Sequence, residues 1–235
     1  CYLDDILIGG GTLDECKDIL FLVLTKLNEF HVKIKIDKCS FFQEKIDYLG
    51  HTISKDGLKP NQEKVFSIIN APNPKNLSEL QSYLGLLNYY GKFIPNLSSH
   101  LKVLYDLLQK NVKFNWTSET EKCFQNSKKL ILDNNVLELY DPQKPIVISC
   151  DASPYGVGAV LSHIVNGVEK PVLFASSTLS PSEKNYLQIH REALAVMFAV
   201  KKFHKYVYGY KFTLCSDNEA LKEILNPNRD TSNIT

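Results

Sequence analysis

The chain has 235 residues, of which 44% are hydrophobic, and this composition excludes an intrinsically disordered chain and allows one large domain or two smaller ones. Its formal net charge of +1 gives no overall basic character of the kind that marks many nucleic-acid-binding proteins. The sequence contains neither an apolar run of roughly 20 residues nor a signal-peptide pattern, which predicts an intracellular protein.

The first pattern along the chain is a pair of adjacent carboxylates. Residues 2–8 are apolar except for Asp4 and Asp5, which predicts a hairpin with both aspartates at its tip. At such a tip at least one carboxylate can reach a metal ion that it shares with another strand. Aspartate pairs are also common in turns for purely conformational reasons, so this pair alone is weak evidence of a metal site.

A helix, a strand and a second hairpin are predicted next. Apolar residues recur at helical spacing over residues 13–30, with Thr12 or Asp14 as the cap. Residues 32–36 alternate between apolar side chains and lysine, which is typical of a half-buried strand. The second hairpin is expected around residues 48–54.

Two capped helices are predicted in the middle of the chain. Asn76 with Glu79 resembles a capping box and precedes leucines at helical spacing. Ser118 with Glu121 repeats the pattern for a helix that reaches about Leu132. The leucines expected on the buried face of the first helix are Leu80, Leu84 and Leu87.

The last third of the chain predicts a mixed α/β layer. Three β-rich runs, 146–150, 157–163 and 171–177, are followed by a long helix over 186–206 and a fourth strand over 212–216. The helical crossover allows the fourth strand to lie parallel to the first. The side chains expected on the buried side of the helix are Ala193, Leu194, Met197 and Val200.

Three carboxylates of this layer are candidates for a metal site. Asp151 ends the first strand, Asp217 ends the fourth, and Glu192 lies in the first turns of the helix. If the two strands are parallel neighbours, the three groups converge and require a hard divalent cation. Two such ions would support phosphodiester hydrolysis. On spacing alone, ordinary strand-end and helix-surface acids are an equally good interpretation.

The motifs resemble those of a known family. Residues 2–5, Tyr-Leu-Asp-Asp, resemble the YxDD motif of reverse transcriptases, and residues 38–41 with 48–51 are similar to the long-terminal-repeat retrotransposon class of gypsy type. Residues 80–90 resemble the thumb helix, and residues 114–116 resemble the start of the connection. The segments that resemble ribonuclease H are residues 150–153 with Gly156 and Gly158, residues 190–195 and residues 216–218.

The resemblance covers nearly the whole chain and implies RNA-directed DNA synthesis with degradation of the template RNA. It implies an α/β (α+β) protein that is an internal fragment of a Pol polyprotein. Residues 1–55 would be the C-terminal part of the palm, residues 56–142 the thumb and connection, and residues 143–235 a C-terminally truncated ribonuclease H-like domain with a mixed sheet.

The resemblance also implies roles for single residues. Asp4 and Asp5 would belong to the polymerase metal site, and Asp151, Glu192 and Asp217 would bind the nuclease metals, Mg²⁺ or alternatively Mn²⁺. The residues expected to contact nucleic acid are Tyr2, the primer-grip residues Tyr48, Leu49 and Gly50, and Gln81, Gly85 and Tyr89 along the minor groove of the hybrid. Gly85 could instead only permit close helix packing, and Tyr89 could be a core aromatic.

The implied partners are an RNA/DNA hybrid, a primer-template, deoxynucleotides in the complete enzyme, and other Pol segments such as integrase and protease, but no membrane. The expected location is the cytoplasm, with virus-like particles and entry into the nucleus as further options. The first polymerase aspartate of the family would lie upstream of residue 1 and the fourth nuclease carboxylate beyond residue 235. We therefore expect this fragment to be inactive as a polymerase by itself, with its nuclease activity left open.

Two rival interpretations remain at this point. The first is a decayed or domesticated relic that binds nucleic acid without catalysis, although the five intact carboxylates argue against long decay. The second is an unrelated metal-dependent phosphotransferase with a ribonuclease H-like core, which the palm and thumb motifs disfavour.

Overall fold

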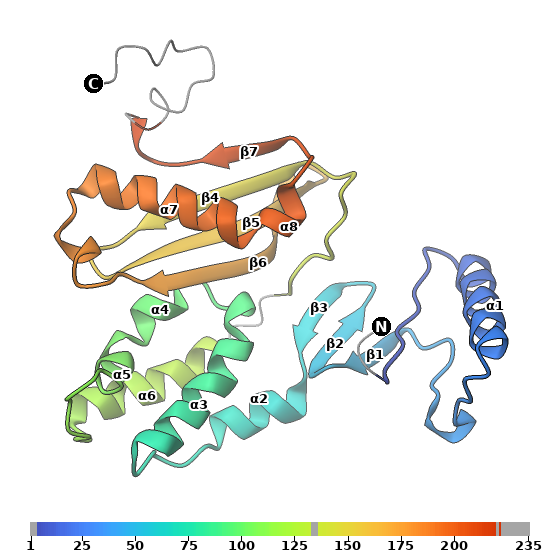
Figure 1. Ribbon diagram of the computed structural model, residues 1–235, viewed down its shortest axis with the longest axis horizontal. Coiled ribbons are helices and arrows are strands. Elements are labelled where there is room, and N and C mark those ends of the chain that lie inside the picture. The colour runs from blue at the N-terminus through green and yellow to red at the C-terminus, as the bar shows by residue number, and fades with distance from the viewer. Residues whose placement is uncertain (1–3, 133–135, 220, 222–235) are drawn as a thin grey trace. The chain divides into compact units, whose positions relative to one another are not determined.

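The computed structural model describes residues 4–132, 136–219 and 221, and the chain divides into two compact units, residues 1–55 and 56–235 (Figure 1). Each unit is described by itself. In the described residues, no helix is both long and apolar enough to cross a membrane.

One helix and one hairpin form the regular part of the first unit. Helix α1 (Leu13–Glu29) begins after Thr12, whose side chain accepts a hydrogen bond from the Glu15 main-chain N–H, so Thr12 is the cap. Strands β1 (Lys45–Tyr48) and β2 (His51–Ser54) pair in antiparallel fashion, as predicted. The turn between them places two residues in the left-handed region, Leu49 with φ 47° and Gly50 with φ 71°.

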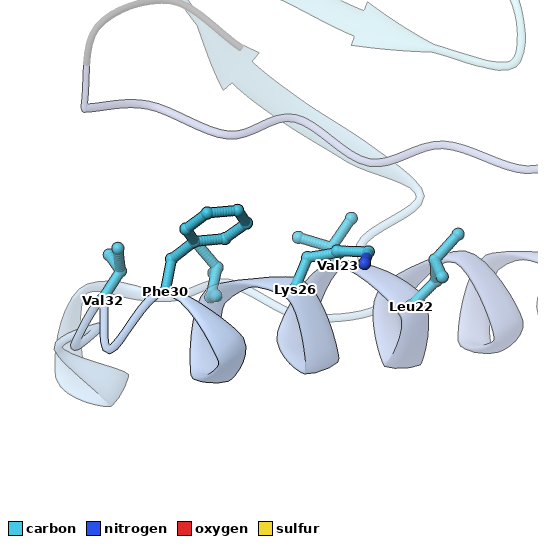
Figure 2. Close-up of a pocket in the computed structure, with 6 residues that line it drawn as sticks. Leu22, Val23, Lys26, Phe30 and Val32 are labelled. Carbon is cyan, nitrogen blue, oxygen red and sulfur yellow. The ribbon is translucent and has the colours of Figure 1, made fainter.

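The apolar side of α1 is uncovered in this unit. None of its residues is buried, and Figure 2 shows Leu22, Val23, Lys26 and Phe30 along one side of the helix, next to Val32. This amphipathic helix therefore gains little from hydrophobic burial within the residues described.

Two predictions for the first unit are corrected by the structure. The strand expected over residues 32–36 is absent, and a 3₁₀ helix, η1 (Ile36–Lys38), follows an irregular segment. Alternation produces a strand only where a neighbouring strand accepts its hydrogen bonds and covers its apolar face, and Val32, Ile34 and Ile36 are all exposed. Residues 2–3 of the first predicted hairpin lie outside the described residues, Asp4 lies in a turn, and residues 6–10 form no strand.

The second unit begins with strand β3 (Gly57–Pro60), bridged by Leu58 to Leu137, and continues into a helical cluster. Its helices are α2 (Gln62–Ile69), α3 (Leu77–Tyr89), η2 (Gly91–Phe93), α4 (Leu97–His100), α5 (Lys102–Asp106) and α6 (Ser118–Leu130). Asn76 caps α3 as predicted, and all three expected leucines of α3 are buried.

The cap of α6 differs from the prediction by one residue. Thr117 is the N-cap and forms a capping box with Thr120. Glu121 instead accepts a hydrogen bond from the Trp116 indole N–H at 2.7 Å. Both Thr117 and Ser118 carry hydroxyl groups that can cap a helix, so local sequence alone did not separate them.

A four-stranded sheet forms the other part of the second unit. Strands β4 (Ile146–Ala152), β5 (Gly156–Val165), β6 (Val168–Thr178) and β7 (Phe212–Cys215) lie in the order β6-β5-β4-β7 (Figure 1). The β4–β7 pair is parallel and the other pairs are antiparallel, as the helical crossover predicted.

The crossover contains η3 (Glu183–Asn185), α7 (Gln188–Lys202) and α8 (His204–Val207), so the single helix predicted over 186–206 is broken. The break falls at Phe203, whose side chain is fully buried in the core. The predicted buried side was also wrong in part, because Met197 is 54% exposed. The residues of α7 that are buried are Glu192, Ala195, Val196 and Ala199.

The opposite face of the sheet contacts the helical cluster. The Ser98 main-chain N–H donates to the Ser176 hydroxyl at 2.9 Å. A Cβ atom on Gly158 would lie only 1.9 Å from the Asn96 side-chain oxygen, so this glycine allows the close approach. Helices therefore cover both faces of the sheet within the second unit.

Candidate functional site

The three carboxylates predicted to converge do so in the structure. Asp151 lies on β4, Asp217 follows β7, and Glu192 lies in the second turn of α7. Because β4 and β7 are parallel neighbours, their carboxyl ends meet at one edge of the sheet. One carboxylate oxygen from each residue lies within 4.8 Å of the others.

Glu192 is the buried member of this cluster, with 3% of its surface exposed. Its Oε1 accepts a hydrogen bond from the Gln188 side-chain amide. Its Oε2 is buried and has no partner at hydrogen-bond geometry among the described groups. A buried acceptor without a partner is costly, so this oxygen is suited to a ligand.

The electrostatics of the cluster agree with this geometry. Burial is the main cause that raises the pKa of Glu192, and the charges of Asp217 and Asp151 raise it further. The hydrogen bond from Gln188 and the nearby main-chain N–H of Ala152 act in the opposite direction. The ionised form is therefore disfavoured until a cation offsets the burial and the repulsion.

The donor set fits a hard divalent cation. Three carboxylates offer the oxygen ligands that Mg²⁺ and Mn²⁺ prefer. Burial, followed by the charge of Glu192, raises the pKa of the adjacent Cys150 thiol to about 11. The thiol thus stays protonated at neutral pH and is a poor ligand for a soft metal.

The other predicted carboxylates lie in the first unit. Asp4 and Asp5 are both exposed, and among the described residues neither belongs to a group of three metal-ligating side chains. The Tyr48 hydroxyl donates to the Asp5 main-chain oxygen at 3.3 Å. The segment of the aspartate pair therefore contacts the β1–β2 hairpin, whose turn holds Leu49 and Gly50. Tyr2 lies outside the described residues.

The three residues expected along the thumb helix share an exposed face of α3. Gln81 and Gly85 are exposed, and Tyr89 is 50% exposed. A Cβ atom on Gly85 would meet no atom within 4 Å, so close helix packing does not explain this glycine. The exposure of Tyr89 likewise excludes a core role.

Sequence reasoning missed two polar residues beside the carboxylates, Gln188 and Arg191. Gln188 contacts Glu192 directly, and the Arg191 guanidinium donates to the Gln188 side-chain oxygen at 2.7 Å. The only signal for these contacts in the sequence is spacing. Gln188 lies four residues before Glu192 and three before Arg191, and side chains at these separations are neighbours on a helix.

Two family models match the chain. Residues 1–53 match the family described as reverse transcriptase (RNA-dependent DNA polymerase), and residues 116–214 match the RNase H-like domain found in reverse transcriptase. The retrovirus-related Pol polyprotein from transposon 297 of Drosophila melanogaster is 39% identical over 227 residues. That alignment covers 96% of this chain but only 21% of the polyprotein.

Two solved structures are similar to this chain in fold. The foamy viral protease-reverse transcriptase dRH in complex with double-stranded DNA is 25% identical with a TM-score of 0.80, over 94% of this chain and 40% of that chain. The foamy viral protease-reverse transcriptase in complex with an RNA/DNA hybrid is also 25% identical, with a TM-score of 0.77 over 94% of this chain and 31% of that chain.

Proposed function

Because this chain belongs to the reverse transcriptases that carry an RNase H-like domain, we propose that it acts within an enzyme that copies RNA into DNA and hydrolyses the RNA of RNA/DNA hybrids. The observation that carries the nuclease part is the convergence of Asp151, Glu192 and Asp217, one of which has a buried oxygen without a partner.

In this proposal the three carboxylates hold Mg²⁺, with Mn²⁺ as an alternative. The chemistry that such an ion would supply is activation of a water molecule and stabilisation of charge on the phosphate during hydrolysis. Asp151 and Asp217 supply oxygens from the sheet edge, and Glu192 supplies Oε2 from the helix. A two-metal arrangement would need further ligands besides these three carboxylates.

For the polymerase part, we propose that Asp4 and Asp5 contribute to the metal site of nucleotide addition. Tyr2, Tyr48, Leu49 and Gly50 would contact the primer strand. The hydrogen bond between Tyr48 and Asp5 supports this assignment, because it links the proposed primer grip to the carboxylate segment. Deoxynucleotides as partners of the complete enzyme belong to the same proposal.

The proposed domains are the palm segment over 1–55, the thumb and connection over 56–142, and the RNase H-like domain over 143–235. We further propose that the protein acts in the cytoplasm, with virus-like particles and entry into the nucleus as further options, and is accompanied by integrase and protease segments. The similarity to a Pol polyprotein supports the proposal that other Pol segments accompany this chain.

A hybrid-cleavage assay tests the nuclease assignment. A complete reverse transcriptase that contains this chain should cut the RNA strand of a labelled hybrid in Mg²⁺ and should not cut it in excess chelator. Cleavage that persists in the chelator would contradict the metal-dependent assignment.

The exposed face of α3 gives a separate prediction for hybrid binding. Gly85→Ala should stabilise the protein by about 0.5 to 1 kcal/mol, since alanine has a higher helix propensity than glycine at an exposed position inside a helix. It should also weaken hybrid binding several-fold, because the added methyl group projects into the open space above α3. Thermal unfolding and fluorescence anisotropy with a labelled hybrid measure the two effects.

Asn126→Ala is the matched control, since Asn126 is an exposed residue of the helix α6. This change should raise stability in the same way and leave hybrid binding unchanged. If Gly85→Ala binds the hybrid as tightly as the wild type, the proposed role of the α3 face is wrong.

A further inference from the structure

Gln188 connects the buried carboxylate to the sheet edge. It is the first residue of α7, and its side-chain NH₂ group donates to Glu192 Oε1. The same NH₂ group donates to the main-chain oxygen of Ala152 at 3.2 Å. Ala152 directly follows Asp151, so one amide group ties the helical carboxylate to the strand that bears a second one.

Arg191 fixes which end of this amide faces the carboxylate. Its Nη2 donates to the Gln188 Oε1 at 2.7 Å, so the oxygen end of the amide is already engaged. The NH₂ end then meets two acceptors, Glu192 Oε1 and the Ala152 carbonyl oxygen. All three contacts agree on one orientation, because a guanidinium can only donate and the Ala152 main-chain carbonyl can only accept.

We propose that Gln188, oriented by Arg191, is a positioning residue that occupies Glu192 Oε1 and so presents only Oε2 to the divalent cation. This inference rests on the proposed metal-binding role of the three carboxylates. It explains why Oε1 of Glu192 has a partner and the buried Oε2 has none.

The positioning has a physical purpose. Without the amide, Glu192 Oε1 would lose its side-chain partner, and the carboxylate would be free to bind a cation through either oxygen or both. Residues that orient a metal ligand change metal affinity by roughly 10- to 100-fold when they are replaced. A loss of this size is expected here.

Mn²⁺ binding to the purified chain tests the inference. Gln188→Met keeps a side chain of similar length but removes the amide, and it should weaken Mn²⁺ binding about 10-fold by calorimetry. The electron paramagnetic resonance spectrum of the bound Mn²⁺ should also change, since the carboxylate geometry changes. Met197→Ala, on the exposed side of α7, should leave both the affinity and the spectrum unaltered.

The outcomes separate the inference from the proposed function. If the wild type binds Mn²⁺ and Asp151→Asn does not, yet Gln188→Met matches the wild type in affinity and spectrum, the positioning role is wrong and the metal site stands. If the wild type binds no Mn²⁺, both are wrong. Should Gln188→Met not fold, Arg191→Met leaves Gln188 in place, and an unchanged affinity and spectrum there would likewise overturn the inference.

Discussion

Replacing Asp151 with asparagine in the complete enzyme is expected to reduce cleavage of an RNA/DNA hybrid by at least about 100-fold while the fold stays intact. The change removes a metal-ligating carboxylate but keeps the size of the side chain. It also removes one of the two charges that disfavour ionisation of Glu192, so the protein without metal should not be destabilised.

Gel analysis of a labelled hybrid measures the cleavage, and circular dichroism checks the fold. Glu169→Gln is the matched control, because Glu169 is an exposed carboxylate on β6 of the same sheet. It should cleave like the wild type. Cleavage at the wild-type rate by Asp151→Asn would remove the nuclease assignment.

Glu192→Gln is expected to have opposite effects on stability and on metal binding. Because its pKa is raised, the carboxyl group of Glu192 holds its proton more tightly in the folded protein than in the unfolded chain. Proton binding by Glu192 therefore contributes to the stability of the folded state. This contribution is fully present below the unfolded-state pKa and is lost as the pH rises through the folded-state pKa. At neutral pH without metal, the glutamine variant should therefore be more stable than the wild type.

Thermal unfolding at acidic and neutral pH, with and without Mg²⁺, tests this prediction. The advantage of the variant should shrink as the pH falls, and added Mg²⁺ should stabilise the wild type alone. Glu183→Gln is an informative control, because hydrogen bonds from Ser180 lower the pKa of Glu183 and give the opposite sign. A metal-free Glu192→Gln protein that is less stable than the wild type at neutral pH would contradict the proposed electrostatics.

The periodicity of apolar residues correctly predicted those helices and strands that bury an apolar face. The leucines of α3 and the apolar runs of β4, β5 and β6 were assigned correctly, since each has a partner that covers it. Residues 32–36 have the same kind of pattern but lack such a partner, and there the prediction was wrong. The short helix α2 was not predicted, although Asn61 caps it and Ile68 anchors it in the core.

For the site, topology was more informative than hydrophobicity. The helical crossover allowed the two strands to be parallel neighbours, and on that condition Asp151 and Asp217 were expected to meet at one edge, as they do. The rotation of α7 was not predictable from apolar residues, because the helix buries Glu192 and leaves Met197 exposed. Gln188 was missed for the same reason, since its contact depends on that rotation.

The uncovered side of α1 affects how the free energy of local unfolding varies along the chain. Helix α3 buries four residues, whereas α1 buries none, so separating α1 from its surroundings exposes little new apolar surface. Local unfolding then costs far less free energy in α1 than in α3. The backbone amides of α1 consequently lose their protection against solvent hydrogen exchange first, well before the core of the second unit opens.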